Sequence, residues 1–326
     1  MKIDGFMVAL AAAVLLAILW PQFGASGGLL RLEFVARYGA AIIFFLYGLT
    51  LSSEKLRAGA SKWRVHLIVQ TTTFVFLPLV MLSVGAVSRP ATDSALWLGF
   101  LYVAALPTTV SSAVAMTSMA RGDVPAAIFN TTISAFFAVA VTPALMAFFV
   151  AGLGGDISFG PAIAKIATLV LAPLVAGQIF RPFLRRFADR HSRQLKQVDR
   201  LVILAIIINA FSDSVQQKAW SSQSPFSLAI TIVAVCAIFA VAYGWTAFLA
   251  RVMNLPRGEG IAAMFCGSNK SLVTGAPMAP LIFGHVPNLA IILTPLMIYH
   301  LLQLVVIGVI ASWYAAESEE HAQGEA

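Results

Sequence analysis

The stretch MFCGSNKSLVTGAPMAP, Met264–Pro280, places a lysine, an asparagine, two glycines and two prolines inside an apolar segment long enough to cross a membrane. Glycine and proline weaken or break a helix. A break inside a bilayer frees backbone groups that must line a cavity or be buried in protein. Lys270 lies about ten residues, or about 15 Å of straight helix, from the nearer end of the segment. An ammonium so deep in the bilayer costs at least about 2.5–3.5 kcal/mol. The stretch therefore predicts a broken membrane helix built around a lysine.

The rest of the chain has the composition of an integral membrane protein. Of its 326 residues, 60% are hydrophobic and 11% are charged, whereas soluble proteins carry about 25% charged residues. Ten apolar segments cover residues 5–21, 34–52, 65–87, 94–119, 124–151, 161–180, 199–218, 226–250, 258–284 and 287–315. Most reach the roughly 20 residues that a membrane-crossing helix needs. They are long and do not alternate, so we expect an all-α integral membrane fold of ten transmembrane helices and not a barrel.

Lysine and arginine are distributed unevenly between the two ends of these segments. With the N-terminus inside, the inner loops hold 15 of the 21 basic residues and the outer loops hold four, while Lys165 and Lys270 lie within segments. This bias predicts a protein of the cell membrane with both termini in the cytoplasm. The most basic loop, RPFLRRFADRHSRQLKQVDR at 181–200, is interpreted as an orientation signal beside anionic headgroups and not as a nucleic-acid site.

A short phrase is repeated about half the chain apart. RGDVPAAI follows the fourth segment and FGHVPNLAI follows the ninth, with Pro125 and Pro287 separated by 162 residues. Each half then holds five segments, so the halves must have opposite orientations, as in inverted-repeat transporters. The predicted organisation is a first repeat over 1–151, a second repeat over 152–315 and a disordered acidic cytoplasmic tail over 316–326.

The two segments that correspond under this repeat, the fourth and the ninth, are also the most interrupted. The fourth reads VAALPTTVSSAVAMTSMARGD, in which Pro107 is followed by four hydroxyl residues. Paired interruptions of this kind point to a transport site near the middle of the membrane. Freed N–H groups at half-helix starts attract anions, and freed carbonyls attract cations. The alternative is a pair of proline-kinked helices whose hydroxyls bond to the preceding turn.

The role of Lys270 is open at this point. No aspartate or glutamate lies in the middle of any segment to neutralise it. The lysine could bind an anionic substrate, or exchange protons if burial holds it partly neutral. It could also take the place of a bound cation and hold the broken helix, or be purely structural and bonded to freed carbonyls.

Other polar residues in the segments are candidates for the same site. They are Asn269 and Ser271 beside the lysine, Thr109 and Ser112 in the fourth segment, Asn130 and Thr131 in the fifth, and Gln70 and Thr73 in the third. Hydroxyls and amides also join membrane helices to one another. His300 with Gln303, and Asn209, are interpreted as such helix contacts. Cys236 and Cys266 have the setting of small core residues and not of a disulfide.

Several of these phrases together resemble a known family. FFLYGLTLSSEKL, LPTTVSSAVAMTSMARGDVPAAIFNTTIS, VTPALM and CGSNKSLVTGAPMAP are similar to the bile acid:sodium symporter superfamily, solute carrier family 10. The closer similarity is to its SBF-like branch, which contains the seventh vertebrate member. The resemblance implies a panel domain of segments 1, 2, 6 and 7 and a core domain of segments 3–5 and 8–10. It also implies that the fourth and ninth helices are discontinuous and cross, and that the protein works by alternating access.

The resemblance further implies sodium sites, which this chain matches only in part. Ser112 and Thr131 match a serine and a threonine of the sodium-coupled members, and they form a partial metal site. Ala113 and Ala127 replace an asparagine and a second serine of that site.

The remaining sodium ligands of the family are also changed. Its ninth-segment glutamate is apolar here, at Phe265 or Cys266, Asn269 stands for its glutamine, Lys270 stands for the next asparagine, and its third-segment glutamine falls near Thr73 with Gln70 one turn away. A carboxylate is lost and a cation is gained, and both changes disfavour sodium.

The sequence thus predicts a bilayer-embedded secondary transporter of a small organic anion, with Na⁺, H⁺ or no coupling ion and no other cofactor. A second hypothesis, which the resemblance permits, is a membrane protein without a transport cycle that regulates calcium or glycan homeostasis. An enzyme is not expected, because Ser271 and Lys270 would point about 100° apart on a helix and make a poor catalytic dyad. The sequence leaves the oligomeric state open.

Overall fold

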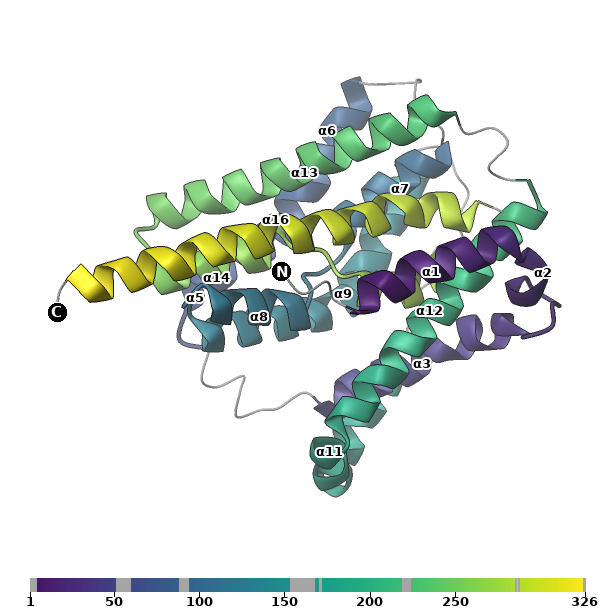
Figure 1. The fold of residues 1–326 in the computed structure, drawn as a ribbon, viewed down its shortest axis with the longest axis horizontal. Coiled ribbons are helices and arrows are strands. Elements are labelled where there is room, and N and C mark those ends of the chain that lie inside the picture. The colour runs from purple at the N-terminus through teal and green to yellow at the C-terminus, as the bar shows by residue number, and fades with distance from the viewer. Residues whose placement is uncertain are drawn as a thin grey trace.

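The computed structural model describes residues 5–50, 60–87, 94–152, 168–169, 172–218, 224–284, 286 and 288–324 as a bundle of helices (Figure 1). The helices are α1 (Gly5–Leu19), α2 (Pro21–Gly24), α3 (Leu32–Thr50), α5 (Trp63–Thr71), η1 (Thr72–Phe76), α6 (Leu77–Val87), α7 (Ser94–Ala105), α8 (Ser111–Met119), α9 (Val124–Gly152), α11 (Ala172–Arg190), α12 (Ser192–Gln216), α13 (Pro225–Val252), α14 (Arg257–Ser268), α15 (Leu272–Phe283) and α16 (Leu289–Gly324). No strand occurs among these residues, so the all-α prediction is confirmed.

Among the residues that the structure describes, four helical stretches are long and apolar enough to cross a membrane. They are Trp63–Ala86, Val124–Val150, Pro225–Val252 and Leu289–Glu317, and Val8–Leu19 and Ala95–Ala105 are shorter apolar helices. These lengths do not establish ten spans, so the span count and the inverted repeat stay predictions. Pro287, which belongs to the repeated phrase, lies outside the described residues.

The fourth and ninth segments are each divided into two helices, as the sequence predicts. Residues 106–110 separate α7 from α8, and residues 269–271 separate α14 from α15. Pro107 has no N–H with which to continue α7. The two gaps meet, because the backbone N–H of Ser271 donates to the carbonyl oxygen of Pro107 at 2.8 Å.

The helices pack in two groups. One group consists of α1, α2, α3, α11 and α12, and its main contacts with the remaining helices are made by α3 and α12 against α15 and α16. α3 and α11 approach most closely. A Cβ on Gly48 would overlap the carbonyl oxygen of Leu174, and a Cβ on Gly177 would overlap that of Phe45. Figure 1 shows α3, α11 and α12 together in the lower part of the molecule, with α13 above.

The structure corrects two predictions about polar segments. The stretch 181–200, expected to be a loop, is helical apart from a turn at His191, because α11 continues to Arg190 and α12 begins at Ser192. The acidic tail, expected to be disordered, is helical as far as Gly324. Both stretches are rich in good helix formers such as arginine, glutamate, leucine and alanine, so a helix that leaves an apolar segment continues into them.

Candidate functional site

Lys270 lies in the gap between α14 and α15, and its side chain is fully buried. Its ammonium group donates hydrogen bonds to the carbonyl oxygens of Leu106 at 2.8 Å, Ala104 at 3.0 Å and Thr73 at 3.3 Å. An ammonium has three N–H donors, so the backbone occupies all of them. Within the described part of the chain Lys270 makes no salt bridge. The lysine therefore joins η1 and the end of α7 to the gap in which it lies.

Local sequence explains why these three carbonyls are free. In η1 the N–H of Leu77 bonds to the carbonyl of Thr72, one residue earlier than in an α-helix. The following residue is Pro78, which has no N–H. The carbonyl of Thr73 is thus left without a donor from its own helix. The other two carbonyls lie in the last turn of α7 and just beyond it, where helix carbonyls have no N–H ahead of them.

The electrostatic setting also favours a cation at this point. Carbonyl groups at the C-terminal end of a helix carry a partial negative charge, equivalent to about half an elementary charge. The Lys270 ammonium lies at that end of α7, since it bonds to Ala104 and Leu106. The carbonyl dipoles at this end of α7 therefore favour the charged form of the Lys270 side chain.

α16 supplies partners for the backbone of the same gap. The Tyr299 hydroxyl donates to the carbonyl of Ser268 at 2.6 Å, and the Gln303 side chain bonds to both backbone groups of Lys270. Sequence reasoning interpreted Gln303 only as a contact of His300. That contact exists, at 2.9 Å between Gln303 Nε2 and His300 Nδ1, but Gln303 also holds the gap. The one signal that could have identified it is a buried amide in an apolar helix.

α9 supplies partners for the gap between α7 and α8. The Thr142 hydroxyl donates to the carbonyl of Ala105 at 2.7 Å, and the Ser134 hydroxyl accepts from the N–H of Thr108 at 3.3 Å. Neither Ser134 nor Thr142 was among the sequence candidates. Each gap is thus held by the long helix that follows it in the chain.

The structure pairs four of the predicted site residues. Gln70 Nε2 donates to the backbone oxygen of Asn130 at 3.2 Å, which joins α5 to α9. The Ser112 hydroxyl donates to the Thr109 hydroxyl at 2.7 Å, at the start of α8. The first pair joins two helices, whereas the second is local to the start of α8.

Three other predicted residues have mainly local partners or none. The Ser271 hydroxyl accepts from the N–H of Thr274 at 3.1 Å and so caps α15. The Thr131 hydroxyl donates to the carbonyl of Ile128 in its own helix at 3.1 Å. Asn269 Oδ1 is buried and has no hydrogen-bond partner among the described residues. Five side-chain oxygens on α5, on η1 and in the two gaps are buried without a hydrogen-bond partner among the described residues. They are Gln70 Oε1, Thr72 Oγ1, Thr73 Oγ1, Thr108 Oγ1 and Asn269 Oδ1.

The residues at the gaps match the sodium site that the resemblance implies only in part. The hydroxyls of Ser112 and Thr131 donate their hydrogens to protein acceptors, which leaves their oxygen lone pairs available to a cation. The position of the missing glutamate, Phe265 or Cys266, is fully buried and apolar. The described residues contain no group of three His, Cys, Asp or Glu side chains that could hold a metal ion. A protonated Lys270 beside these neutral oxygens would repel a second cation.

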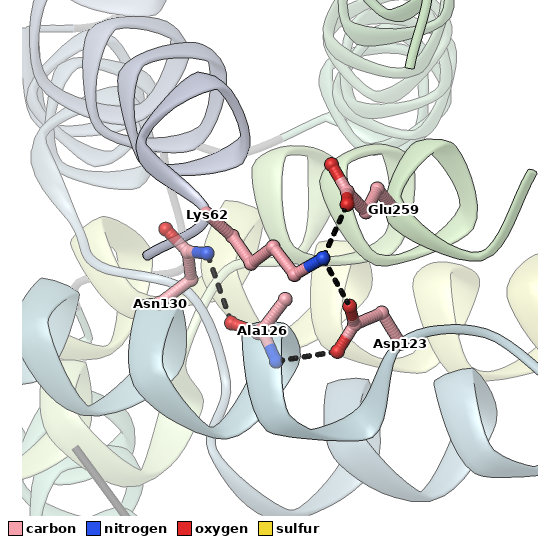
Figure 2. A network of polar contacts seen from close by, with 5 residues as sticks. All are labelled: Lys62, Asp123, Ala126, Asn130 and Glu259. Atoms are coloured by element: carbon pink, nitrogen blue, oxygen red, sulfur yellow. Dashed lines mark hydrogen bonds and ion pairs between the residues drawn. The ribbon is translucent and has the colours of Figure 1, made fainter. Parts of the chain in front are cut away.

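A second polar cluster lies at the starts of α5, α9 and α14 (Figure 2). Lys62 Nζ lies 2.7 Å from Glu259 Oε1 and 3.9 Å from Asp123 Oδ2. The other oxygen of Asp123 accepts from the N–H of Ala126 at 2.9 Å and caps α9. The hydrogen bond from Lys62 to Glu259, together with the charge of that carboxylate, raises the pKa of Lys62 above its ordinary value. One ammonium therefore joins the first turns of three helices that also carry residues of the central site.

Comparison with known proteins places these features in a family. The model of the SBF-like CPA transporter family matches residues 4–316. "Uncharacterized protein PA2026" of Pseudomonas aeruginosa is 37% identical over 319 residues, which cover 98% of this chain and 95% of that protein. "Sodium/bile acid cotransporter 7" of Danio rerio is 31% identical over 97% of this chain and 96% of its own length. The mouse protein of the same name is 31% identical over 97% and 95%. With its apolar helices, the chain is a multi-pass membrane protein, and it belongs to the SBF-like CPA transporter family.

Proposed function

We propose that this protein is a secondary transporter that moves a small organic anion across the cell membrane by alternating access, without Na⁺ as a coupling ion. The Lys270 ammonium takes the place of a coupling cation in this proposal. The observation that carries it is the bonding of Lys270 to three backbone carbonyls at the meeting point of two helix gaps. Transporters with broken helices bind coupling cations through such freed carbonyls and half-helix ends. Here the chain supplies the positive charge itself.

The same meeting point favours an anionic solute. α8 and α15 both begin there, and the free N–H groups of a helix start attract negative charge. The fixed charge of Lys270 adds to this field without contacting the solute, because its three donors are occupied. The unpaired oxygens of Thr108 and Asn269 can accept hydrogen bonds from a solute hydroxyl or amide group. A carboxylate, sulfate or phosphate ester with further polar groups is the class of solute that fits.

Two observations support an inverted repeat with a panel and a core. The gap in each proposed repeat is held by the helix that follows it, through Ser134 and Thr142 of α9 and through Tyr299 and Gln303 of α16. α1, α3, α11 and α12 pack mainly on one another, as the panel of such a transporter would. In the proposed cycle this panel stays fixed while the crossed helices move against it. Both termini face the cytoplasm, as the distribution of basic residues supports.

Chemical complementation tests the role of Lys270. Lys270→Ala removes the ammonium and leaves three carbonyl oxygens around a small vacancy. Ethylammonium, and to a smaller degree Na⁺, should then raise the thermal unfolding midpoint of the purified variant, whereas the bulkier choline should not. Wild-type protein should show no specific response to any of the three cations. Equal responses of the variant and wild type would remove the basis of the proposal.

Transport itself is measured in proteoliposomes with organic anions first selected by thermal stabilisation of the purified protein. Wild-type uptake should be equal with Na⁺ and with choline outside. Lys270→Ala should lose uptake and recover part of it with Na⁺ or ethylammonium. Wild-type uptake that requires Na⁺ would show that Lys270 does not replace the coupling ion.

A further inference from the structure

The second half of α11 carries an exposed apolar face. Its first half packs against α3, where Gln178 Nε2 donates to the carbonyl of Gly48 at 2.7 Å. Farther along, the side chains of Phe180, Phe183 and Phe187 are 50%, 81% and 52% exposed. Spacings of three and four residues place these rings on one face of the helix. Three large rings on one exposed face require an apolar medium or partner outside the fold.

Basic side chains border this apolar face. The stretch 181–200 holds seven lysines and arginines against two aspartates, Asp189 and Asp199. Arg186 and Arg190 are exposed. They follow Phe183 by three and seven residues, so at 100° per residue they lie beside its ring along one edge of the face. Arg193, also exposed, follows just after the turn at His191. Aromatic rings and guanidinium groups therefore alternate on one side of the α11–α12 junction.

We propose that the α11–α12 junction, residues 179–193, binds the headgroups of anionic phospholipids. Helices that combine an apolar face with flanking basic residues lie at the boundary between headgroups and acyl chains. The arginines bind lipid phosphates there, and the phenylalanine rings enter the acyl region. Clusters of basic residues just cytoplasmic of a membrane helix are attracted by anionic lipids. A nucleic acid would account for the arginines but would leave the row of phenylalanines without a partner.

The position of this surface gives lipid binding a mechanical consequence. The junction connects the two helices that pack with α1 and α3. Because α11 and α3 approach at Gly48 and Gly177 without intervening side chains, an anchor on α11 also holds α3. Anionic lipid would thus fix this helix group at the cytoplasmic leaflet. The inference does not depend on which solute the protein carries.

Thermal unfolding of the purified full-length protein in a neutral detergent tests the proposal. Added phosphatidylglycerol should raise the unfolding midpoint more than phosphatidylcholine does, and about 0.5 M salt should reduce that difference by screening. The double variant R186Q/R190Q should lose most of the phosphatidylglycerol effect. R64Q/R251Q, which removes two exposed arginines from the same predicted side of the membrane, is the matched control and should keep it.

Several results would overturn the proposal. Equal stabilisation by the two lipids would do so, as would a phosphatidylglycerol effect that survives in R186Q/R190Q or in high salt. Glycerol phosphate at the same concentration should have no effect, and a full effect would indicate a site for free phosphate. An equal shift with a short RNA would indicate a nucleic-acid surface instead. If R186Q/R190Q does not fold, native mass spectrometry of wild type decides, because phosphatidylglycerol must be retained in preference to phosphatidylcholine.

Discussion

The side-chain amide of Gln303 bonds to both backbone groups of Lys270. Its Oε1 accepts the Lys270 N–H at 2.7 Å, and its Nε2 donates to the Lys270 carbonyl oxygen at 2.8 Å. Lys270 lies between two helices, so neither group has a partner within its own helix. One residue of α16 thus replaces two helical hydrogen bonds and fixes the backbone from which the ammonium projects.

Replacing Gln303 with leucine should destabilise the protein strongly. The change leaves a buried N–H and a buried carbonyl without partners, at about 1–3 kcal/mol each. The thermal unfolding midpoint of purified Gln303→Leu should fall well below that of wild type. Gln216→Leu, at the exposed end of α12, is the control and should change stability by less than about 0.5 kcal/mol. Equal midpoints for the two variants would show that the amide does not hold the gap.

The sequence predicts the helix breaks and the lysine because their signals are local. A proline, a glycine or a charge within an apolar run is visible in the run itself. The partners of the lysine are not visible in this way. Ala104 and Leu106 have no polar side chain, and they contribute only carbonyl groups that a break elsewhere makes available. What identifies these partners is the backbone geometry. Pro78 and Pro107, one to five residues further along the chain, leave the carbonyls without N–H donors from their own helices.

Side-chain chemistry alone was also a poor guide to which polar residues act together. Thr131 and Ser271 match the pattern of a site, yet their hydroxyls bond within their own segments. Gln303, interpreted as a helix contact, reaches a residue 33 positions away. Hydroxyls in a helix can bond to the preceding turn or across to a neighbouring helix. Only the packing of the helices decides between these two outcomes.

The Thr142 hydroxyl should contribute more to stability than an ordinary helix hydroxyl. It donates to the carbonyl of Ala105 in the last turn of α7, where no N–H of that helix is available. Thr142→Val keeps the shape of the side chain and should cost about 1–2 kcal/mol in unfolding free energy. Thr294→Val is the matched control, because Thr294 bonds to the Ala290 carbonyl of its own helix. A control variant as unstable as Thr142→Val would contradict this role.

The Lys62 cluster should stabilise the protein up to alkaline pH. Glu259 raises the pKa of Lys62, so this stabilisation is complete below the ordinary pKa of lysine, about 10.4. It is lost as the pH rises through the raised value. The unfolding midpoint of Lys62→Met should therefore lie below that of wild type by a constant amount from pH 7 to 9, and the two should converge at strongly alkaline pH. Arg64→Met, beside it, should show no such convergence. A difference that disappears near neutral pH would mean that the ion pair is not its source.

Pro78 should matter because it withholds an N–H from the carbonyl of Thr73. Pro78→Ala supplies that N–H at the i to i−5 spacing already present in η1. In wild type the new donor competes with Lys270 for the Thr73 carbonyl, so Pro78→Ala should slow anion uptake while the protein stays folded.

The same change should have the opposite effect on stability in the Lys270→Met background. Lys270→Met leaves the Thr73 carbonyl unpaired, and the N–H that Pro78→Ala supplies gives it a partner, which should recover about 1–3 kcal/mol of unfolding free energy. Pro143→Ala, inside α9, is the control, because the N–H that it supplies is directed to the carbonyl of Val139, which is not an acceptor of Lys270. The N–H gained by Pro78→Ala and the Lys270 ammonium use the same acceptor, so the effects of Pro78→Ala and Lys270→Met on stability must be non-additive. Equal effects of Pro78→Ala in both backgrounds would mean that the Thr73 carbonyl is not the point at which Lys270 binds η1.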